Sequence, residues 1–188
     1  MIWLWLGVLA WSGIHALPAL APTFRTSLID RLGAKGYQIG FALLIVGSVL
    51  LMILGWRSAV ADIVYEPPGF GRHLAMLLML VAFVLFGLSH GKSNLKRFIP
   101  HPQLTAMSVW AIAHLLANGD SRSVVLFGVL GIWALIEMLL IGRRDGVPIP
   151  PEPRPWSAEA KPVIIGVVMY VIFVFLHPYL FGVSPIGV

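Results

Sequence analysis

Six stretches of the chain consist almost entirely of apolar residues, and charged residues gather between them. They cover residues 2–21, 39–61, 73–90, 102–118, 123–141 and 162–184. Each reaches or approaches the roughly 20 residues that a helix needs to cross the hydrocarbon core of a membrane. The pattern therefore predicts an all-α protein, a polytopic transmembrane bundle of about six spanning helices.

The composition supports a membrane protein. Of the 188 residues, 59% are hydrophobic and 11% are charged, and the mean hydropathy is +0.90. A small water-soluble core could not hide that many apolar side chains. The net charge of +5 comes from short segments between apolar stretches, where retention at the cytoplasmic face explains it better than a nucleic-acid partner. The chain has no cysteine, so it offers no disulfide and no thiolate ligand for iron.

The basic residues also predict an orientation. Ten of the 13 lie in the first, third and fifth connecting segments, which places those segments in the cytoplasm and both termini outside, in the periplasm if the membrane is a bacterial inner membrane. The ten are Arg25, Arg31, Lys35, Lys92, Lys96, Arg97, Arg143, Arg144, Arg154 and Lys161. Proline-rich residues 148–155 are too polar and stiff for a helix and predict an extended cytoplasmic connector. No composition break divides residues 1–188, so we expect a single domain.

Histidines inside the apolar stretches are the main chemical signal. His114 lies in the middle of one stretch and His15 lies within another, whereas Glu137 is the only carboxylate well inside an apolar stretch. A titratable side chain at membrane depth indicates a functional site by default. Zinc would require several nitrogen, oxygen or sulfur ligands, and no such spacing occurs. A b-type haem requires one or two imidazoles, an apolar slot and a cation near its propionates. The pattern thus favours a buried haem.

The neighbours of these histidines fit that hypothesis. Trp110, His114 and Asn118 recur every four residues, so an aromatic ring and an amide would flank the imidazole on one helix face. Pro18 cannot donate to the carbonyl of Ile14, which frees an acceptor that could orient the ring of His15. The outer arginines, Arg72 and Arg122, are candidate propionate partners if the propionates face outward. Alternatively, a membrane histidine can simply form a hydrogen bond across a helix interface.

Several short motifs occur along the chain: His101-Pro102-Gln103, Trp110, Ala113-His114, His15, Pro68-Gly69 before His73, and His177-Pro178. Together they resemble the NnrU family of membrane proteins, over essentially the whole chain. That family includes NnrU proteins of denitrifying bacteria and the plastid zeta-carotene isomerase of plants. The resemblance implies a b-haem with axial ligands at His15 and His114. The isomerase branch has a cysteine one turn before the second ligand, where this chain has Ala111, so the resemblance does not imply thiolate exchange here.

Three classes of function follow, and whether the chain is an enzyme stays open among them. The first is a haem b membrane protein that supports nitrite or nitric oxide metabolism, as an accessory factor or by handling nitric oxide at the iron. The second is a haem-dependent cis-trans isomerase acting on a carotenoid-like polyene. The third is a transporter or assembly factor without a cofactor. The expected partners are membrane lipid, haem, and either nitric oxide or a hydrophobic polyene, with no nucleic acid.

The predicted orientation can be tested with reporter fusions. Alkaline phosphatase fused after Val188 should be active, because it folds only outside the cytoplasm, and green fluorescent protein inserted in residues 148–155 should fluoresce. Enzyme activity and fluorescence in intact cells measure the two positions. Fluorescence at the C-terminus together with phosphatase activity at the connector would reverse the topology.

Overall fold

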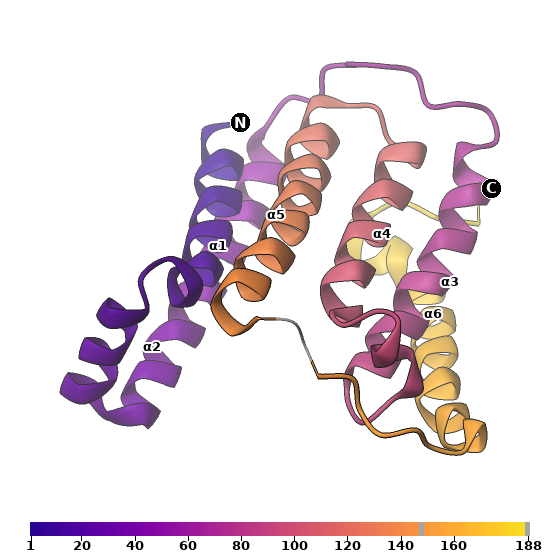
Figure 1. Cartoon of the computed structure of the whole chain (residues 1–188). Coiled ribbons are helices and arrows are strands. Elements are labelled where there is room, and N and C mark those ends of the chain that lie inside the picture. The colour runs from indigo at the N-terminus through magenta and orange to yellow at the C-terminus, as the bar shows by residue number, and fades with distance from the viewer. Residues whose placement is uncertain (147–148, 187–188) are drawn as a thin grey trace. The chain divides into compact units, whose positions relative to one another are not determined.

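The computed structural model describes residues 1–146 and 149–186. Over these residues the chain forms six α-helices and two 3₁₀ helices, with no strand and one isolated bridge between Ile63 and Asp120 (Figure 1). The all-α prediction is confirmed. The elements are α1 (Ile2–Leu20), α2 (Pro22–Ser58), α3 (Gly71–Ser89), η1 (Asn94–Arg97), α4 (Pro102–Ala117), α5 (Ser121–Asp145), η2 (Trp156–Glu159) and α6 (Ala160–Phe181).

The contacts divide the helices into two compact units of three helices each. The first unit comprises Met1–Glu66 and Gly119–Gly146, and the second comprises Pro67–Asn118 and Val147–Val188, of which residues 149–186 are described. In the first unit α1 packs against both α2 and α5, and in the second α3 packs against both α4 and α6. Each unit combines two segments that are distant in the sequence, so the chain cannot be cut once into two domains. The expectation of a single domain stays a prediction.

Five of the described α-helices are long and apolar enough to cross a membrane, namely α1, α2, α3, α5 and α6. α4 has 16 residues, about 24 Å at ~1.5 Å per residue, slightly less than the ~30 Å hydrocarbon core. Large apolar side chains are exposed along these helices, among them Leu43, Leu139 and Phe175, as expected for surfaces that face lipid tails. The chain is a multi-pass membrane protein of about six spanning helices.

The helix α2 begins earlier than the sequence predicts. The sequence predicts a loop at residues 22–38, but α2 starts at Pro22 and consists of two helical segments that meet at a kink at Gly33 (φ 72°, ψ 162°) and together span 37 residues (Figure 1). Proline suits the first turn of a helix because the backbone N–H groups of that turn have no carbonyl partner within the helix, so the missing N–H of proline costs nothing. A glycine adopts the positive φ of the kink without strain. The polar composition of this segment hid the helix, since it lacks the apolar stretch by which the other helices were recognised.

Small residues allow the helices of each unit to approach closely. A Cβ atom on Gly7 of α1 would lie 2.7 Å from the backbone nitrogen of Met52 in α2. A Cβ atom on Gly166 of α6 would lie 2.6 Å from the carbonyl oxygen of Phe83 in α3. Helices in lipid gain no hydrophobic stabilisation by associating, so they rely on such close packing.

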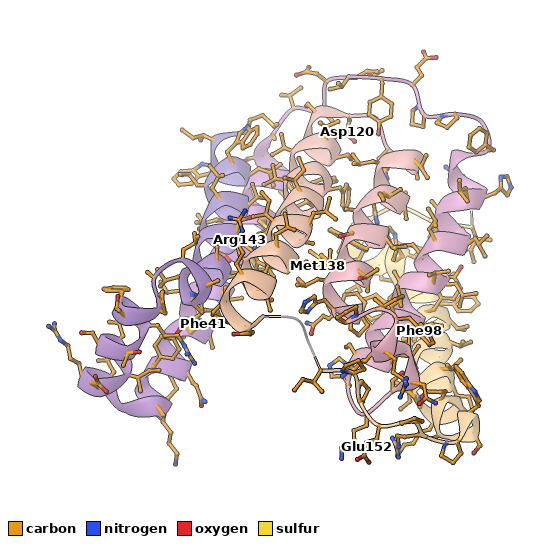
Figure 2. All side chains as sticks on the ribbon, viewed as in Figure 1. Phe41, Phe98, Asp120, Met138, Arg143 and Glu152 are labelled. Atoms are coloured by element: carbon orange, nitrogen blue, oxygen red, sulfur yellow. The ribbon has the colours of Figure 1, made fainter. Side chains whose placement is uncertain are left out.

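The connector before α6 is held by polar side chains of the second unit. Its predicted first residue, Pro148, lies outside the described residues, and residues 149–155 form no regular structure, as expected. The buried Asn94 side chain donates to the carbonyl of Arg154 (2.8 Å) and accepts from its backbone nitrogen (2.9 Å). Glu159 accepts from the hydroxyl of Ser93 and the backbone nitrogen of Asn94, both at 2.7 Å. Glu152 lies on this connector (Figure 2).

The kink in α2 gives the first stability prediction. Gly33→Ala should destabilise the protein by about 1–3 kcal/mol, because its backbone conformation is essentially restricted to glycine. Gly47→Ala is the matched control: Gly47 lies in the straight part of α2, and a Cβ atom there meets nothing within 4 Å. Thermal unfolding in detergent should show a lower Tm for Gly33→Ala alone. An equal Tm for both variants would contradict the assignment of the kink.

Candidate functional site

His15 lies on α1, and its ring is oriented by its own helix. The Nδ1 atom is 2.9 Å from the carbonyl oxygen of Trp11, one turn earlier, and the Trp11 ring lies 4.4 Å from the imidazole between centroids. The expectation that the carbonyl of Ile14 would orient this ring is therefore wrong. Helical side chains tilt toward the N-terminus, so the carbonyl four residues back is the one within reach.

Aromatic rings from the other two helices of the first unit surround His15. Phe41 of α2 stands edge-on at 5.5 Å and Trp133 of α5 at 5.1 Å between ring centroids, and Phe41 is labelled in Figure 2. Trp11 and Trp133 also meet edge to face at 6.2 Å. The half-buried imidazole thus sits in an aromatic enclosure to which α1, α2 and α5 all contribute, as the apolar slot of a cofactor site requires.

Polar atoms without a partner are concentrated in the first unit. Among the described residues, four buried side-chain atoms make no hydrogen bond. An unpaired polar group at membrane depth costs several kcal/mol, so these atoms indicate where a bound polar group would be stabilised. They are Trp11 Nε1, Tyr37 Oη, Trp133 Nε1 and Glu137 Oε2.

His114 on α4 has the same local arrangement in the second unit. Its Nδ1 atom is 2.9 Å from the carbonyl oxygen of Trp110, and the two rings lie 5.0 Å apart. Asn118 lies one turn further along the same helix, and its Nδ2 atom donates to the backbone carbonyl of His114 at 2.9 Å. Asn118 is the C-terminal cap of α4, which leaves its side chain beside the last free carbonyls.

Both imidazoles are arranged as metal-ligating histidines usually are. A carbonyl can only accept, so Nδ1 carries the proton in each ring and the lone pair is on Nε2. A backbone partner of this kind fixes the tautomer and the ring orientation of a ligating histidine. His15 and His114 belong to different units, each described by itself, so their coordination of one iron remains a prediction. Within the described ranges no three His, Asp or Glu side chains cluster as a metal ion held by several ligands would need.

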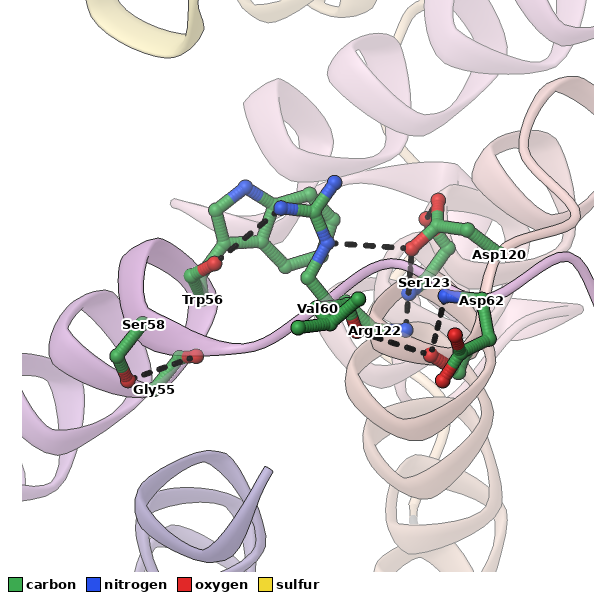
Figure 3. Close-up of polar contacts among 9 residues, drawn as sticks. Gly55, Trp56, Ser58, Val60, Asp62, Asp120, Arg122 and Ser123 are labelled. Carbon is green, nitrogen blue, oxygen red and sulfur yellow. Dashed lines mark hydrogen bonds and ion pairs between the residues drawn. The ribbon is translucent and has the colours of Figure 1, made fainter.

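The structure gives Arg122 partners of its own at the start of α5. Its guanidinium forms an ion pair with Asp120 (3.4 Å), lies 4.8 Å over the ring of Trp56 and approaches the carbonyl of Trp56 at 3.4 Å (Figure 3). Arg72 lies exposed in the first turn of α3 and makes no ion pair with any residue that the structure describes. Of the two predicted propionate partners, Arg122 is therefore already engaged in contacts within the fold.

The segment that connects α2 to α3 is hydrogen-bonded to the start of α5, and we call this junction of residues 60–62 with residues 120–123 the corner. Ser121 donates its backbone N–H to the carbonyl of Asp62 at 2.8 Å, while its hydroxyl accepts from the Asp62 N–H at 3.2 Å. Asp120 caps α5 by accepting from the backbone nitrogens of Arg122 (3.0 Å) and Ser123 (3.2 Å). The hydroxyl of Ser123 also donates to Asp120, at 2.7 Å. This corner positions α5, and with it Trp133 beside His15.

Comparison with known families decides the relationship. The model of the family described as NnrU protein matches residues 3–185, nearly the whole chain. The chain belongs to the NnrU family. None of the curated proteins and none of the solved structures matches it.

The sequence alone missed several side chains of this NnrU site. Trp11, Trp133 and Tyr37 were not singled out, and Glu137 was noted only as a lone carboxylate. The sequence does contain a signal, a tryptophan four residues before a polar residue. This spacing occurs three times, as Trp11 and His15, Trp110 and His114, and Trp133 and Glu137. This spacing stacks a tryptophan against the following polar residue on the same helix face. What the spacing could not show is that α1 and α5 bring two of these pairs together.

The cap of α5 in this NnrU chain is a measurable element of stability. Asp120→Ala should destabilise the protein by about 1 kcal/mol, the typical value of an N-terminal cap. Asp62→Ala is the control, because Asp62 joins the same corner through its backbone and its side chain is exposed. Unfolding midpoints in detergent at neutral pH should separate the two variants.

The same cap predicts a pH dependence. Burial alone would raise the pKa of Asp120, but hydrogen bonds from Ser123 and the hydrogen bond and charge of Arg122 outweigh burial and lower it. A lowered pKa in the folded state stabilises the protein fully above the unfolded pKa of about 4, and this contribution is lost as the pH falls through the folded pKa. The difference in Tm between the parent and Asp120→Ala should therefore shrink below about pH 4. A difference that grows in acid would contradict this role.

Proposed function

We propose that this NnrU family member binds haem b in a bacterial inner membrane, with both termini in the periplasm, and supports nitrite or nitric oxide metabolism. The observation that carries the proposal is the shared arrangement of His15 and His114. Each imidazole directs Nδ1 to the carbonyl of a tryptophan one turn earlier, at 2.9 Å in both cases, and a backbone partner at Nδ1 is typical of histidines that bind a metal through Nε2.

The surroundings of His15 support the same ligand. Phe41, Trp11 and Trp133 provide flat apolar surfaces beside the imidazole, and a porphyrin needs such surfaces. The unpaired Nε1 atoms of both tryptophans add hydrogen-bond donors. His15 and His114 would hold the iron, and Trp110 would line the ring. When bound, haem iron held by imidazole takes up small diatomic ligands and passes single electrons.

The choice between nitric oxide metabolism and polyene isomerisation rests on the ligands available. The chain has no cysteine, and Ala111 occupies the position at which the isomerase branch carries one. Ala111 is almost fully buried on α4. An exchange of imidazole for thiolate therefore has no donor in this chain, whereas His15 and His114 would be sufficient to hold a haem that takes up an external diatomic molecule. This favours the handling of nitric oxide.

Histidine variants test the proposal. His15→Ala and His114→Ala should each weaken haem binding about tenfold or more, because each removes an axial bond worth more than ~1.4 kcal/mol. His90→Ala is the control: His90 is exposed at the end of α3, and its Nδ1 atom contacts the carbonyl of Phe86. Haem content and the Soret spectrum of purified protein measure the effect. Unchanged spectra in both single variants would rule out these ligands.

The nitric oxide role has its own measurement. Adding nitric oxide to the reduced, haem-loaded parent should change the Soret band, because nitric oxide would compete with His15 or His114 for the iron. The Ala111→Cys variant serves for comparison, since sulfur one turn before His114 could compete for the iron. A parent spectrum that does not respond to nitric oxide would refute the role in nitric oxide handling and leave haem binding in place.

A further inference from the structure

A cleft lined by both charged and apolar side chains opens in the first unit beside the enclosure of His15. Its volume is about 520 Å³, within the range of ~300–1,000 Å³ usual for small-molecule sites. All three helices of this unit contribute to it, α1 and α5 through their C-terminal ends. Its lining includes Pro18, Arg25, Tyr37, Phe41, Arg144 and Asp145.

The cleft carries an excess of positive charge. Arg144 donates through Nε and Nη2 to the two carboxylate oxygens of Asp145, each at 2.7 Å. The Arg25 guanidinium lies 5.8 Å from the centre of the Tyr37 ring and makes no hydrogen bond or ion pair with a described residue. Two guanidinium groups thus face one carboxylate, and Arg25 keeps its donors available for an anion.

Tyr37 provides a buried hydrogen-bond donor near these charged side chains. The hydroxyl of Tyr37 is shielded from solvent and makes no hydrogen bond within the described part of the chain. Tyr37 also lies 6.2 Å from Phe41 between ring centroids. A phenol and a guanidinium on the same helix therefore offer donors to one acidic group, and an unpaired buried hydroxyl is stabilised when an acceptor reaches it.

The cleft adjoins His15 through its apolar walls. Pro18 follows His15 by three residues on α1, and the Phe41 ring lies 5.5 Å from the imidazole. Arg122, in contrast, lies 22 residues before Arg144 on α5, about 33 Å away at ~1.5 Å per residue. The arginines of the cleft, rather than the outer arginine, share a pocket with the walls of the His15 enclosure.

We propose that this cleft binds the acidic groups of the ligand that His15 coordinates, which under the proposed function are the two propionate carboxylates of haem b. The inference rests on the proposed function. Arg25 is the principal partner, because its guanidinium can bind a carboxylate through two hydrogen bonds without losing an existing ion pair. Tyr37 donates to the same carboxylates, and Arg144 adds charge while it remains bonded to Asp145. The propionates therefore face the side of the membrane on which Arg25 and Arg144 lie.

Comparing two forms of the ligand tests this assignment. The full-length apoprotein is titrated in detergent with haem b and with haem b dimethyl ester, whose propionates carry no charge. The parent should bind the free acid about tenfold or more tightly than the ester, as expected for a charge-assisted hydrogen bond. Arg25→Gln should bind both forms with similar affinity, and Arg25→Lys should restore part of the preference. Soret titrations give the Kd values.

Two arginines that lie outside the cleft serve as controls. Arg31→Gln changes a cation on the same part of α2, and Arg143→Gln changes the neighbour of Arg144 on α5. Both variants should keep the parent's preference for the free acid. Because Arg25 is exposed, its replacement should leave the Tm nearly unchanged, so an effect on the preference reports binding rather than folding.

The outcomes separate this inference from the proposed function. If the parent binds haem b and its dimethyl ester equally, the inference is overturned while haem binding stands. A preference lost in Arg72→Gln or Arg122→Gln but kept in Arg25→Gln would move the propionates to the outer arginines and also overturn it. If the parent binds neither form, both proposals fail together.

A further experiment tests whether the cleft binds an anionic lipid headgroup instead of the haem propionates. The parent and Arg25→Gln are placed in nanodiscs of phosphatidylcholine containing phosphatidylglycerol, and the lipid that copurifies after detergent extraction is quantified. Equal phosphatidylglycerol retention by both proteins is the expected result. If Arg25→Gln loses this lipid and keeps the preference for free-acid haem, the cleft binds a lipid headgroup, and the inference is overturned.

Discussion

The hydrogen bond between an imidazole and its own helix is the interaction on which the candidate site depends. At membrane depth there is no water to satisfy a polar ring, so a histidine must find its partner in the protein. His15 and His114 find it in the carbonyl four residues back. This bond orients the ring and places the proton of a neutral imidazole on Nδ1. The same bond thus satisfies a donor that lipid could not, and it is the arrangement from which the proposed role of the two histidines is argued.

The tryptophan that supplies each carbonyl also covers one side of the imidazole. Trp11 and Trp110 lie 4.4 Å and 5.0 Å from the rings they accompany. Around His15, Phe41 and Trp133 complete the cover, and their own helices are held close by glycines and by the capped start of α5. Packing between helices therefore serves the site directly: a bulkier residue at Gly7 would separate α1 from α2 and open the enclosure.

Charge in the first unit is divided between two separate ends of α5. At its start, Arg122 is committed to Asp120 and Trp56, so this end is a structural corner. At its other end, Arg144 and Asp145 border a cleft in which Arg25 forms no ion pair with a residue of the described ranges. Arginine is suited to either role. The same residue type thus stabilises the fold at the start of α5, and near the other end of α5 it is the residue on which the proposed anion site depends.

The sequence by itself determined the class of protein, the approximate number of apolar helices and the presence of two histidines inside them. Hydropathy and helical spacing are local properties that lipid imposes on each segment separately. It also placed Trp110 beside His114. Only the tertiary structure decided that Phe41 and Trp133 enclose His15, that Arg122 has partners within the fold, and that residues 22–38 form a kinked helix which brings Arg25 beside Tyr37. These features depend on which helices pack together and at what rotation. That choice is set by the glycine contacts, the cap at Asp120 and the kink at Gly33, none of which produces a periodic pattern in the sequence.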